Sequence, residues 1–361
     1  MKNRAGYEES EYGDLTSFER FVEWEGIPFI RDVLIKDVRT LDLPPWRRLA
    51  GAGAYIQLGN PRDPQNVVAY VCEIPPKGSL KPQKCNCEEM IFVLKGSGAT
   101  RIWLDSGGEQ AFEWQENSLF SPPINVWRQH FNGGSEPARF LGLTNLPAVF
   151  NLFHNYDFVF HNDFVFQDRI EKLDSAFKGD GTLLEKKRMF WESNFIPDIR
   201  QLKMFDWSLK GPGATNIALE MANNMMSAHI TRSPDGVYKK AHRHGPGAYI
   251  LVLQGKGYSL MWPEGEETER YDWGPGSLFS PPSRWFHQHF NTGRDPLIML
   301  ALKGWGRKFP QQGRRLGFTS TRKGGDMIEF EDEESWIRSR FEEELAREGI
   351  ECRMPPIVPA G

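Results

Sequence analysis

The chain of 361 residues contains no apolar run of the roughly 20 residues that a membrane-spanning helix requires. Its first stretch, Met1–Asp14, is polar and acidic and lacks the apolar core of a secretory signal peptide. The chain also lacks a run of Lys or Arg, and its formal net charge is −4, so nothing indicates nucleic-acid binding. We therefore expect a cytoplasmic protein that binds neither membranes nor nucleic acid.

Cysteine is scarce, with four residues in the whole chain, and this number does not suggest a fold held by disulfides. Cys85 and Cys87 are separated by a single residue, so we expect them not to bond easily to each other. A zinc or redox site at this pair is the alternative, but it would need two more soft ligands, and the local sequence offers none clearly.

Aromatic residues, in contrast, are abundant, with 25 Phe and 12 Trp, and 39% of all residues are hydrophobic. Runs rich in Val, Ile, Tyr, Phe and Trp alternate with Gly, Pro, Asn and Asp turns at short intervals, which predicts short strands. Short strands with even turn spacing favour a sandwich or a closed barrel, and the chain length suggests two domains.

Helical patterns are expected only outside these strand-rich stretches. Thr16–Glu25 predicts a short helix in which Glu19 can complete an N-terminal cap. Ala176–Ser193 and Glu334–Glu348 predict two further helices, the second because its apolar residues recur at helical spacing. The aromatic stretch Asn151–Gln167 is expected to be a strand or loop packed on a barrel, with a lid over a barrel mouth or a subunit contact as the alternative.

An internal repeat relates the two halves of the chain. An offset of 159 residues places Gly96 on Gly255 and Ser118–Pro123 on Ser277–Pro282, with no gap across the surrounding segment. The chain is therefore predicted to contain the same unit twice, each time as a leader followed by a barrel.

This repeat sets the domain boundaries and the assembly that we expect. The predicted segments are an N-terminal arm and leader at 1–45, barrel one at 46–150, a linker with a helix at 151–205, barrel two at 206–310, and a C-terminal helix and tail at 311–361. The exposed leaders and the C-terminal helix lead us to expect a homo-oligomer.

Barrel two carries three histidines in a pattern that is typical of a metal site. His242 and His244 are separated by one residue, so in an extended strand their side chains point to the same side. His287 lies in a later strand that follows a turn rich in Pro and Gly. Three imidazole nitrogens on one face would bind a transition metal and leave some of its coordination positions open.

These stretches resemble the two sequence motifs of the cupin family. Gly236–Gly255 fits the first motif, Gly-x5-His-x-His-x3,4-Glu-x6-Gly, except that Ala248 stands where the family has glutamate. Gly276–Asn291 fits the second motif, Gly-x5-Pro-x-Gly-x2-His-x3-Asn, except that Arg284 replaces the second glycine. The resemblance implies an all-β chain of two tandem jelly-roll barrels with a few flanking helices, and a metal held by three histidines.

Barrel one does not preserve these ligands. At the same offset, the residues that correspond to His242, His244, Ala248 and His287 are Gln83, Cys85, Glu89 and Arg128. Because a guanidinium repels a divalent cation, we expect Arg128 and Glu89 to form an ion pair in the space of a lost metal site. Barrel one is therefore predicted to be structural.

His289 is a candidate fourth ligand or acid–base group, because strand alternation places it on the same face as His287. Its counterpart His130 occurs in the barrel without the metal motif, and this sharing favours a structural role for both.

Arg284 is the candidate substrate clamp, because a guanidinium near a metal can hold a carboxylate through its forked donors. A surface arginine on a loop is the alternative for this residue. Lys239 and Lys240 could add positive potential nearby, but we expect both to be solvated.

The histidine set also resembles that of the gentisate and salicylate ring-cleaving dioxygenases, which are two-barrel cupins that lack the motif glutamate. In that family the intact site typically lies in the first barrel, whereas here it lies in the second, and Tyr249–Ile250 stand where an arginine tends to hold the substrate. The resemblance implies Fe(II), with manganese, nickel, zinc and copper as alternative metals. It also implies O2 and a small hydroxylated aromatic acid as substrates.

Two other classes of function remain open from the sequence. One is a different metal-dependent reaction on the same fold, either cleavage of a β-diketone or thiol by O2, or a lyase or isomerase reaction. The other is a non-enzymatic bicupin that binds a small ligand.

Overall fold

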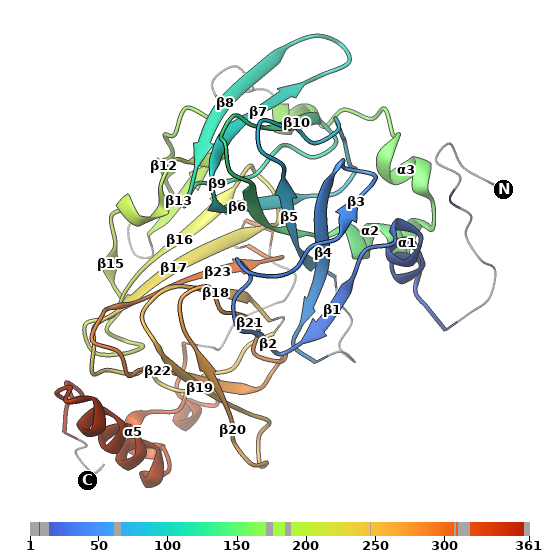
Figure 1. Ribbon diagram of the computed structural model, residues 1–361. Helices are drawn as coiled ribbons and strands as arrows, with labels where there is room; N and C mark the ends of the chain where they lie inside the picture. Colours follow the sequence, from blue (N-terminus) through green and yellow to red (C-terminus); the bar gives the residue numbers. More distant parts are fainter. Residues whose placement is uncertain are drawn as a thin grey trace.

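The computed structural model describes residues 7, 14–60, 66–170, 176–184, 189–245, 247–306, 308–309 and 318–356. The arm expected at the start of the chain lies almost entirely outside these residues. Most of the regular structure is β, and it forms two barrels that occupy the upper and lower parts of Figure 1. Among the described helices, none is long and apolar enough to cross a bilayer.

Barrel one is built from a large sheet and a three-stranded sheet. The large sheet has the order β1 (Phe29–Asp32), β4 (Gly51–Leu58), β5 (Val68–Ile74), β11 (Ala138–Thr144), β6 (Glu89–Lys95), β9 (Leu119–Phe120) and β14 (Phe195–Ile196), and β3 (Pro45–Trp46) pairs with β4. The small sheet has the order β10 (Trp127–Asn132), β7 (Ser97–Trp103) and β8 (Glu109–Gln115).

Barrel two repeats this arrangement. Its large sheet has the order β12 (Thr182–Leu183), β13 (Phe190–Ser193), β16 (Thr215–Met221), β17 (Ser227–Ser233), β23 (Leu297–Lys303), β18 (Tyr249–Gln254), β21 (Leu278–Phe279) and β2 (Leu34–Ile35), and β15 (Phe205–Asp206) pairs with β16. Its small sheet has the order β20 (Glu269–Trp273), β19 (Gly257–Trp262) and β22 (Phe286–Asn291). The matching strand orders confirm the predicted all-β fold of two tandem barrels.

The two leaders exchange strands between the barrels. β2, from the leader at 1–45, pairs with β21 of barrel two, and β14, from the segment at 151–205 that leads into barrel two, pairs with β9 of barrel one. The two large sheets also share one apolar core, to which Val71 and Leu141 contribute from one barrel and Leu219 and Leu300 from the other. Because side chains alternate along a strand, the opposite face of each sheet points into its own barrel.

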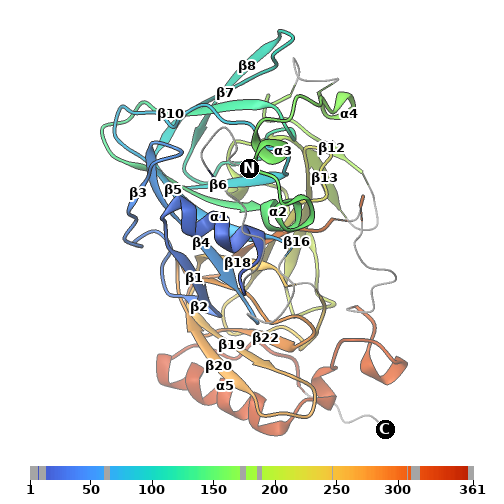
Figure 2. The same cartoon turned by 90° about the vertical axis from the view of Figure 1, so that its right-hand side faces the viewer.

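Five helices lie outside the sheets of the described chain (Figure 2). They are α1 (Ser17–Glu25), α2 (Leu146–Phe153), α3 (Tyr156–Phe160), α4 (Gln167–Ile170) and α5 (Ser335–Glu348), and there are short 3-10 turns at Ile199–Gln201, Thr321–Lys323 and Phe330–Asp332. The predicted cap of α1 is present, because the Glu19 N–H donates to the Thr16 hydroxyl at 3.2 Å and the Glu19 carboxylate accepts from the Thr16 N–H at 2.8 Å.

The predicted C-terminal helix is confirmed as α5, which covers the small sheet of barrel two with Phe341 and Leu345 buried against Tyr258 and Phe290. The aromatic stretch packs on barrel one as expected, because Tyr156 and Phe160 belong to the buried core of that barrel. The strand or loop expected there is wrong in part, because α3 and the end of α2 are helical.

The helix predicted at Ala176–Ser193 is wrong. The segment contains β12 and β13, which pair with each other in antiparallel fashion, and β13 also pairs with β16 in parallel. Residues 185–188 lie outside the described part. Pairing with the sheet of barrel two therefore overrides the local helical preference of this segment.

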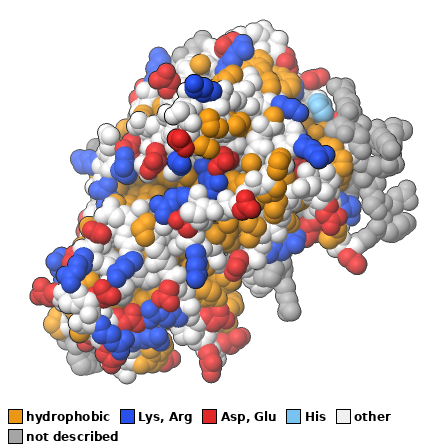
Figure 3. Space-filling model, in the orientation of Figure 1, with side chains coloured by type: hydrophobic (Ala, Val, Ile, Leu, Met, Phe, Trp, Pro, Cys, Tyr) orange, Lys and Arg blue, Asp and Glu red, His pale blue; other side chains and the backbone are white. Residues whose placement is uncertain are grey.

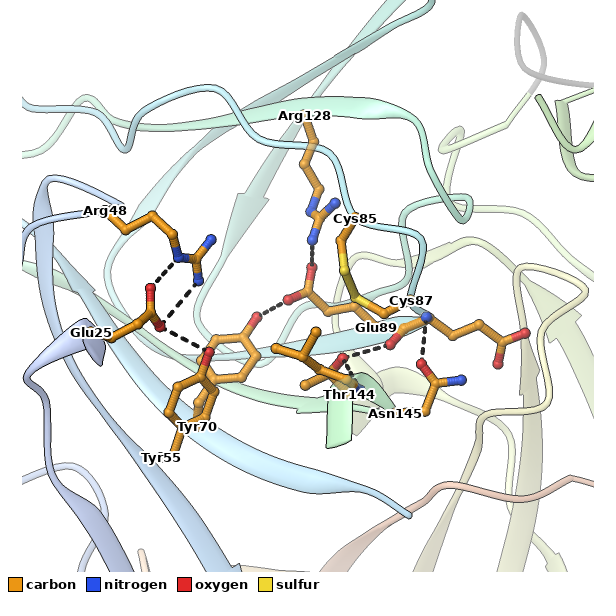
Figure 4. Close-up of a disulfide and its surroundings, with 12 residues drawn as sticks. Glu25, Arg48, Tyr55, Tyr70, Cys85, Cys87, Glu89, Arg128, Thr144 and Asn145 are labelled. Atoms are coloured by element: carbon orange, nitrogen blue, oxygen red, sulfur yellow. Dashed lines mark hydrogen bonds and ion pairs between the residues drawn. A yellow bond between two sulfur atoms is a disulfide. The ribbon is translucent and has the colours of Figure 1, made fainter. Parts of the chain in front are cut away.

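The expectation for the cysteine pair is also wrong, because Cys85 and Cys87 form a disulfide (Figure 4). The chain bends at Asn86 and Cys87, and the two Cα atoms lie 5.1 Å apart, which is within the usual reach of a disulfide. Cys72 is buried and free, and Cys352 is partly exposed and free.

Candidate metal centre

The structure brings the three predicted metal ligands together. His242 lies just before β18, and its backbone exchanges hydrogen bonds with that of His287 in β22, at 3.1 and 2.9 Å. The candidate ligand atoms of His242, His244 and His287 all lie within 4.8 Å of one another. Two adjacent segments of the barrel thus present three imidazoles to one point.

The hydrogen bonds around these rings prepare them for a metal. The Nδ1 of His242 donates to the Lys240 carbonyl, and the Nδ1 of His287 donates to the Trp285 carbonyl, both at 3.1 Å. Each bond requires the proton on Nδ1, so in the neutral ring Nε2 keeps its lone pair for a metal.

The protonation state of these rings also suits metal binding. Burial, with a smaller contribution from Lys210, lowers the pKa of His287 to about 4 and holds the pKa of His242 well below its usual value. Both rings are therefore neutral at physiological pH, which is the form that binds metals. Three imidazoles of this kind fit a divalent transition metal.

His289 borders the same cavity, but its Nδ1 lies 2.8 Å from the Ser259 hydroxyl, which also accepts a hydrogen bond from the Trp273 indole. In barrel one, the Nδ1 of His130 lies 2.7 Å from the hydroxyl of Thr100 in the same way. This histidine–hydroxyl pair occurs in both barrels, with and without a metal site. His289 therefore makes the same contact as His130, which indicates a structural role.

A cavity of about 410 Å³ opens beside the three histidines, in the interior of barrel two. Alternate residues of the large sheet face it, including Ala218 from β16, His229 from β17 and Ala301 from β23. Trp207, Trp305 and Phe318 add aromatic walls. The volume lies within the range of roughly 300–1,000 Å³ that is usual for small-molecule sites.

Barrel one fills the equivalent space, where a volume of only about 30 Å³ remains. Strand register places Tyr55 and Tyr70 where barrel two has Ala218 and His229. The predicted ion pair is present, with Arg128 Nη2 at 2.8 Å from Glu89 Oε2, and the Tyr70 hydroxyl donates to the same carboxylate (Figure 4). The larger side chains and this ion pair close the first barrel.

Arg284 does not reach the cavity: it is not one of the described lining residues, and its guanidinium pairs with Asp326 at 3.1 Å. Its side chain is 56% exposed. The backbone of Arg284 has φ 67°, and its counterpart Asn125 has φ 56°. A left-handed backbone at this position explains why the cupin motif has glycine here.

We expect the variant Arg284→Asn, which introduces the residue of barrel one, to keep the metal content and the substrate affinity of the wild type. Asp326 keeps its second partner, Arg243, at 2.9 Å in this variant, and the left-handed backbone suits asparagine better than arginine. Metal analysis and a binding titration would check this. A tenfold or larger loss of substrate affinity would contradict this expectation and support Arg284 as the substrate clamp.

Three cationic residues line the cavity, and sequence reasoning missed two of them, Lys210 and Lys303, and named only Lys239. The expectation that Lys239 is solvated is wrong, because the residue is only 6% exposed, whereas Lys240 forms an ion pair with Glu329. The repeat could have indicated two of these lysines, because Lys239 and Lys303 correspond to uncharged residues of barrel one at the offset of 159.

Comparisons with known proteins support this architecture. No family model matches the chain. A stretch of 144 residues is 27% identical to gentisate 1,2-dioxygenase from Haloferax sp, and it spans only 37% of this chain and 38% of that protein.

Two solved structures share the fold over nearly the whole chain. A mutant of Bacillus subtilis oxalate decarboxylase superposes with a TM-score of 0.54 at 11% identity, over 92% of this chain and 90% of that chain. The Lactobacillus farciminis oxalate decarboxylase formate complex gives 0.52 at 12% identity, over 90% and 96%. The chain is thus a bicupin by fold, and its second barrel contains a three-histidine cluster that can hold a metal.

Proposed function

We propose that the chain is an Fe(II)-dependent dioxygenase that opens the ring of a small hydroxylated aromatic acid with O2. One observation carries the proposal: three converging histidines face a cavity of about 410 Å³ that has aromatic walls and buried ammonium groups. The stretch that is similar to gentisate 1,2-dioxygenase supports the same reaction class.

His242, His244 and His287 would hold the metal through their imidazole nitrogens. The described part of the cluster adds no carboxylate, so these ligands leave the double charge of the metal uncompensated and suit an anionic substrate. Iron at this place would supply the activation of O2, which side chains alone do not provide. Manganese is the first alternative, because the Bacillus subtilis oxalate decarboxylase has Mn(II) centres.

The remaining residues would bind and orient the substrate. Ala218, Ala248 and Ala301 leave the space that an aromatic ring needs. The Trp305 ring lies 5.9 Å from the His244 ring, and the rings of Trp207 and Phe318 meet edge to face at 5.4 Å. These aromatic surfaces can pack on a substrate ring and exclude water from it.

Oxygen uptake by the iron-loaded protein tests the proposal, with gentisate, salicylate and related hydroxybenzoates as substrates. We expect one or more of these acids to support O2 consumption and to lose their aromatic absorbance. The variant Ala218→Tyr, which introduces the residue of barrel one, should keep its iron and lose turnover, because a tyrosine fills the cavity.

If the iron form consumes no O2 with any of these acids, ring cleavage is wrong. Turnover of the same acids under nitrogen, with manganese or zinc, would instead indicate a lyase or isomerase that uses the metal as a Lewis acid. We also propose that the chain forms a homo-oligomer, which sedimentation of the purified protein would test.

A further inference from the structure

Three lysines, Lys210, Lys239 and Lys303, line the cavity of barrel two, and we call them the lysine cluster. Lys210 and Lys239 are only 3% and 6% exposed, although lysine is almost never fully buried unless its charge is compensated. Burial lowers the pKa of Lys239 to about 8, and burial together with neighbouring lysines holds the pKa of Lys210 well below its usual value. Two ammonium groups of the cluster are thus held away from bulk water, inside the cavity that the histidines face.

The surroundings of the cluster are those of a binding site for a ring with acidic groups. The Lys239 ammonium donates to the Thr231 hydroxyl at 2.8 Å. The Lys303 ammonium lies 4.7 Å from the centre of the Trp305 ring, and the Lys210 ammonium lies 4.8 Å from that of Phe318. Cations therefore alternate with aromatic surfaces around the cavity.

The repeat shows that the fold itself does not need a lysine at position 239. The backbone N–H of Lys239 donates to the His289 carbonyl at 3.2 Å, and that of Leu80 donates to the His130 carbonyl at 2.9 Å. The two residues are therefore equivalent, and barrel one has leucine where barrel two has a buried ammonium.

The other two lysines also stand where barrel one has uncharged residues. The carbonyls of Lys210 and Leu49 accept equivalent backbone hydrogen bonds, at 2.7 and 2.8 Å. Lys303 ends β23 and Thr144 ends β11, and each is paired with the first residue of the neighbouring strand. All three lysines thus replace uncharged residues, and they do so only in the barrel that has the histidine cluster and the open cavity.

The charge balance of the cavity favours an anion. Among the described lining residues, the three lysines face two carboxylates, and one of these, Asp206, is exposed. On the outer face seen in Figure 3, basic and acidic side chains are interspersed. The three lysines and the three candidate metal ligands line the same cavity, so the lysine cluster and the metal site share one space.

We propose that the lysine cluster is an anion subsite that binds a second carboxylate of the substrate, apart from the oxygens that meet the metal. The preferred substrate would then be a hydroxylated aromatic dicarboxylate rather than a monocarboxylate. This inference rests on the proposed function for the aromatic ring and for the metal-binding oxygens. The lysines themselves hold the second carboxylate by charge-assisted hydrogen bonds.

Calorimetric titration of the metal-loaded protein under nitrogen tests the subsite without turnover. The probes are salicylate and two salicylates with a second carboxylate, hydroxyterephthalate and hydroxyisophthalate. In the wild type we expect at least one dicarboxylate to bind more tightly than salicylate by roughly ten- to a hundredfold, the range for a charge-assisted hydrogen bond.

The matched variants are Lys239→Leu and Lys303→Thr, which introduce the residues of barrel one. Each should bring the affinity ratio of dicarboxylate to salicylate close to one, and the metal content checks that each variant is folded. The control is Lys256→Leu, which removes an exposed lysine paired with Glu348 and should keep the wild-type ratio.

Equal affinity of the wild type for salicylate and for both dicarboxylates would overturn the subsite, as would a wild-type ratio in both lysine variants. These outcomes are separate from those of oxygen uptake. A preference for dicarboxylates without O2 consumption would keep the subsite and reject the dioxygenase. O2 consumption with salicylate, without a preference for dicarboxylates, would keep the dioxygenase and reject the subsite.

Discussion

Replacing His244 by alanine should strip the protein of its metal. The candidate site of the described chain has three side-chain ligands, and their ligand atoms all lie within 4.8 Å of one another. Loss of one imidazole leaves two, and the alanine at position 248 supplies no carboxylate in compensation. Elemental analysis of protein purified without a chelating tag would show a single metal ion per chain in the wild type and a small fraction of that in the variant.

The matched control is Gln83→Ala, which alters the corresponding position of barrel one. Because barrel one is filled by an ion pair and large side chains, this variant should keep the full metal content. Two ions per chain in the wild type, or an unchanged content in His244→Ala, would contradict the assignment. A metal that binds only the folded state also raises thermal stability, so chelation should lower the melting temperature of the wild type and not that of His244→Ala.

The features that the sequence predicted well depend on patterns that can be recognised along the chain. The two barrels follow from a repeat with a constant offset, and the convergence of His242 with His244 follows from strand alternation. The ion pair between Arg128 and Glu89 could be predicted because both residues stand at positions whose counterparts in barrel two face one point. In each case the repeat or the alternation of side chains was enough.

The features that were missed depend on contacts between distant segments. β2 and β14 have two residues each, too few to show a periodicity, yet they connect the two barrels. Arg284 pairs with Asp326, which lies 42 residues further along the chain. Lys210 acquires its place only when the loop that precedes β16 folds over the cavity.

The largest effect on stability is expected for Arg128→Leu in barrel one. Arg128 is 3% exposed, and its partner Glu89 is 7% exposed, so the variant leaves a buried carboxylate without its cation. Removal of one member of a buried ion pair typically costs about 3–5 kcal/mol of the free energy of unfolding. We therefore expect a marked fall in the urea concentration at the midpoint of denaturation, with metal binding in barrel two retained at low urea.

A second substitution distinguishes the unpaired charge from lost packing as the cause. In the background of Arg128→Leu, Glu89→Gln removes the charge and keeps an oxygen that can accept from the Tyr70 hydroxyl, which donates to Glu89 in the wild type. The double variant should thus recover much of the lost stability, because a buried amide costs less than a buried carboxylate. Arg101→Leu, which breaks an exposed pair with Glu109 in the same barrel, should change the midpoint little. If the double variant is no more stable than Arg128→Leu, packing of the arginine rather than its charge holds barrel one closed.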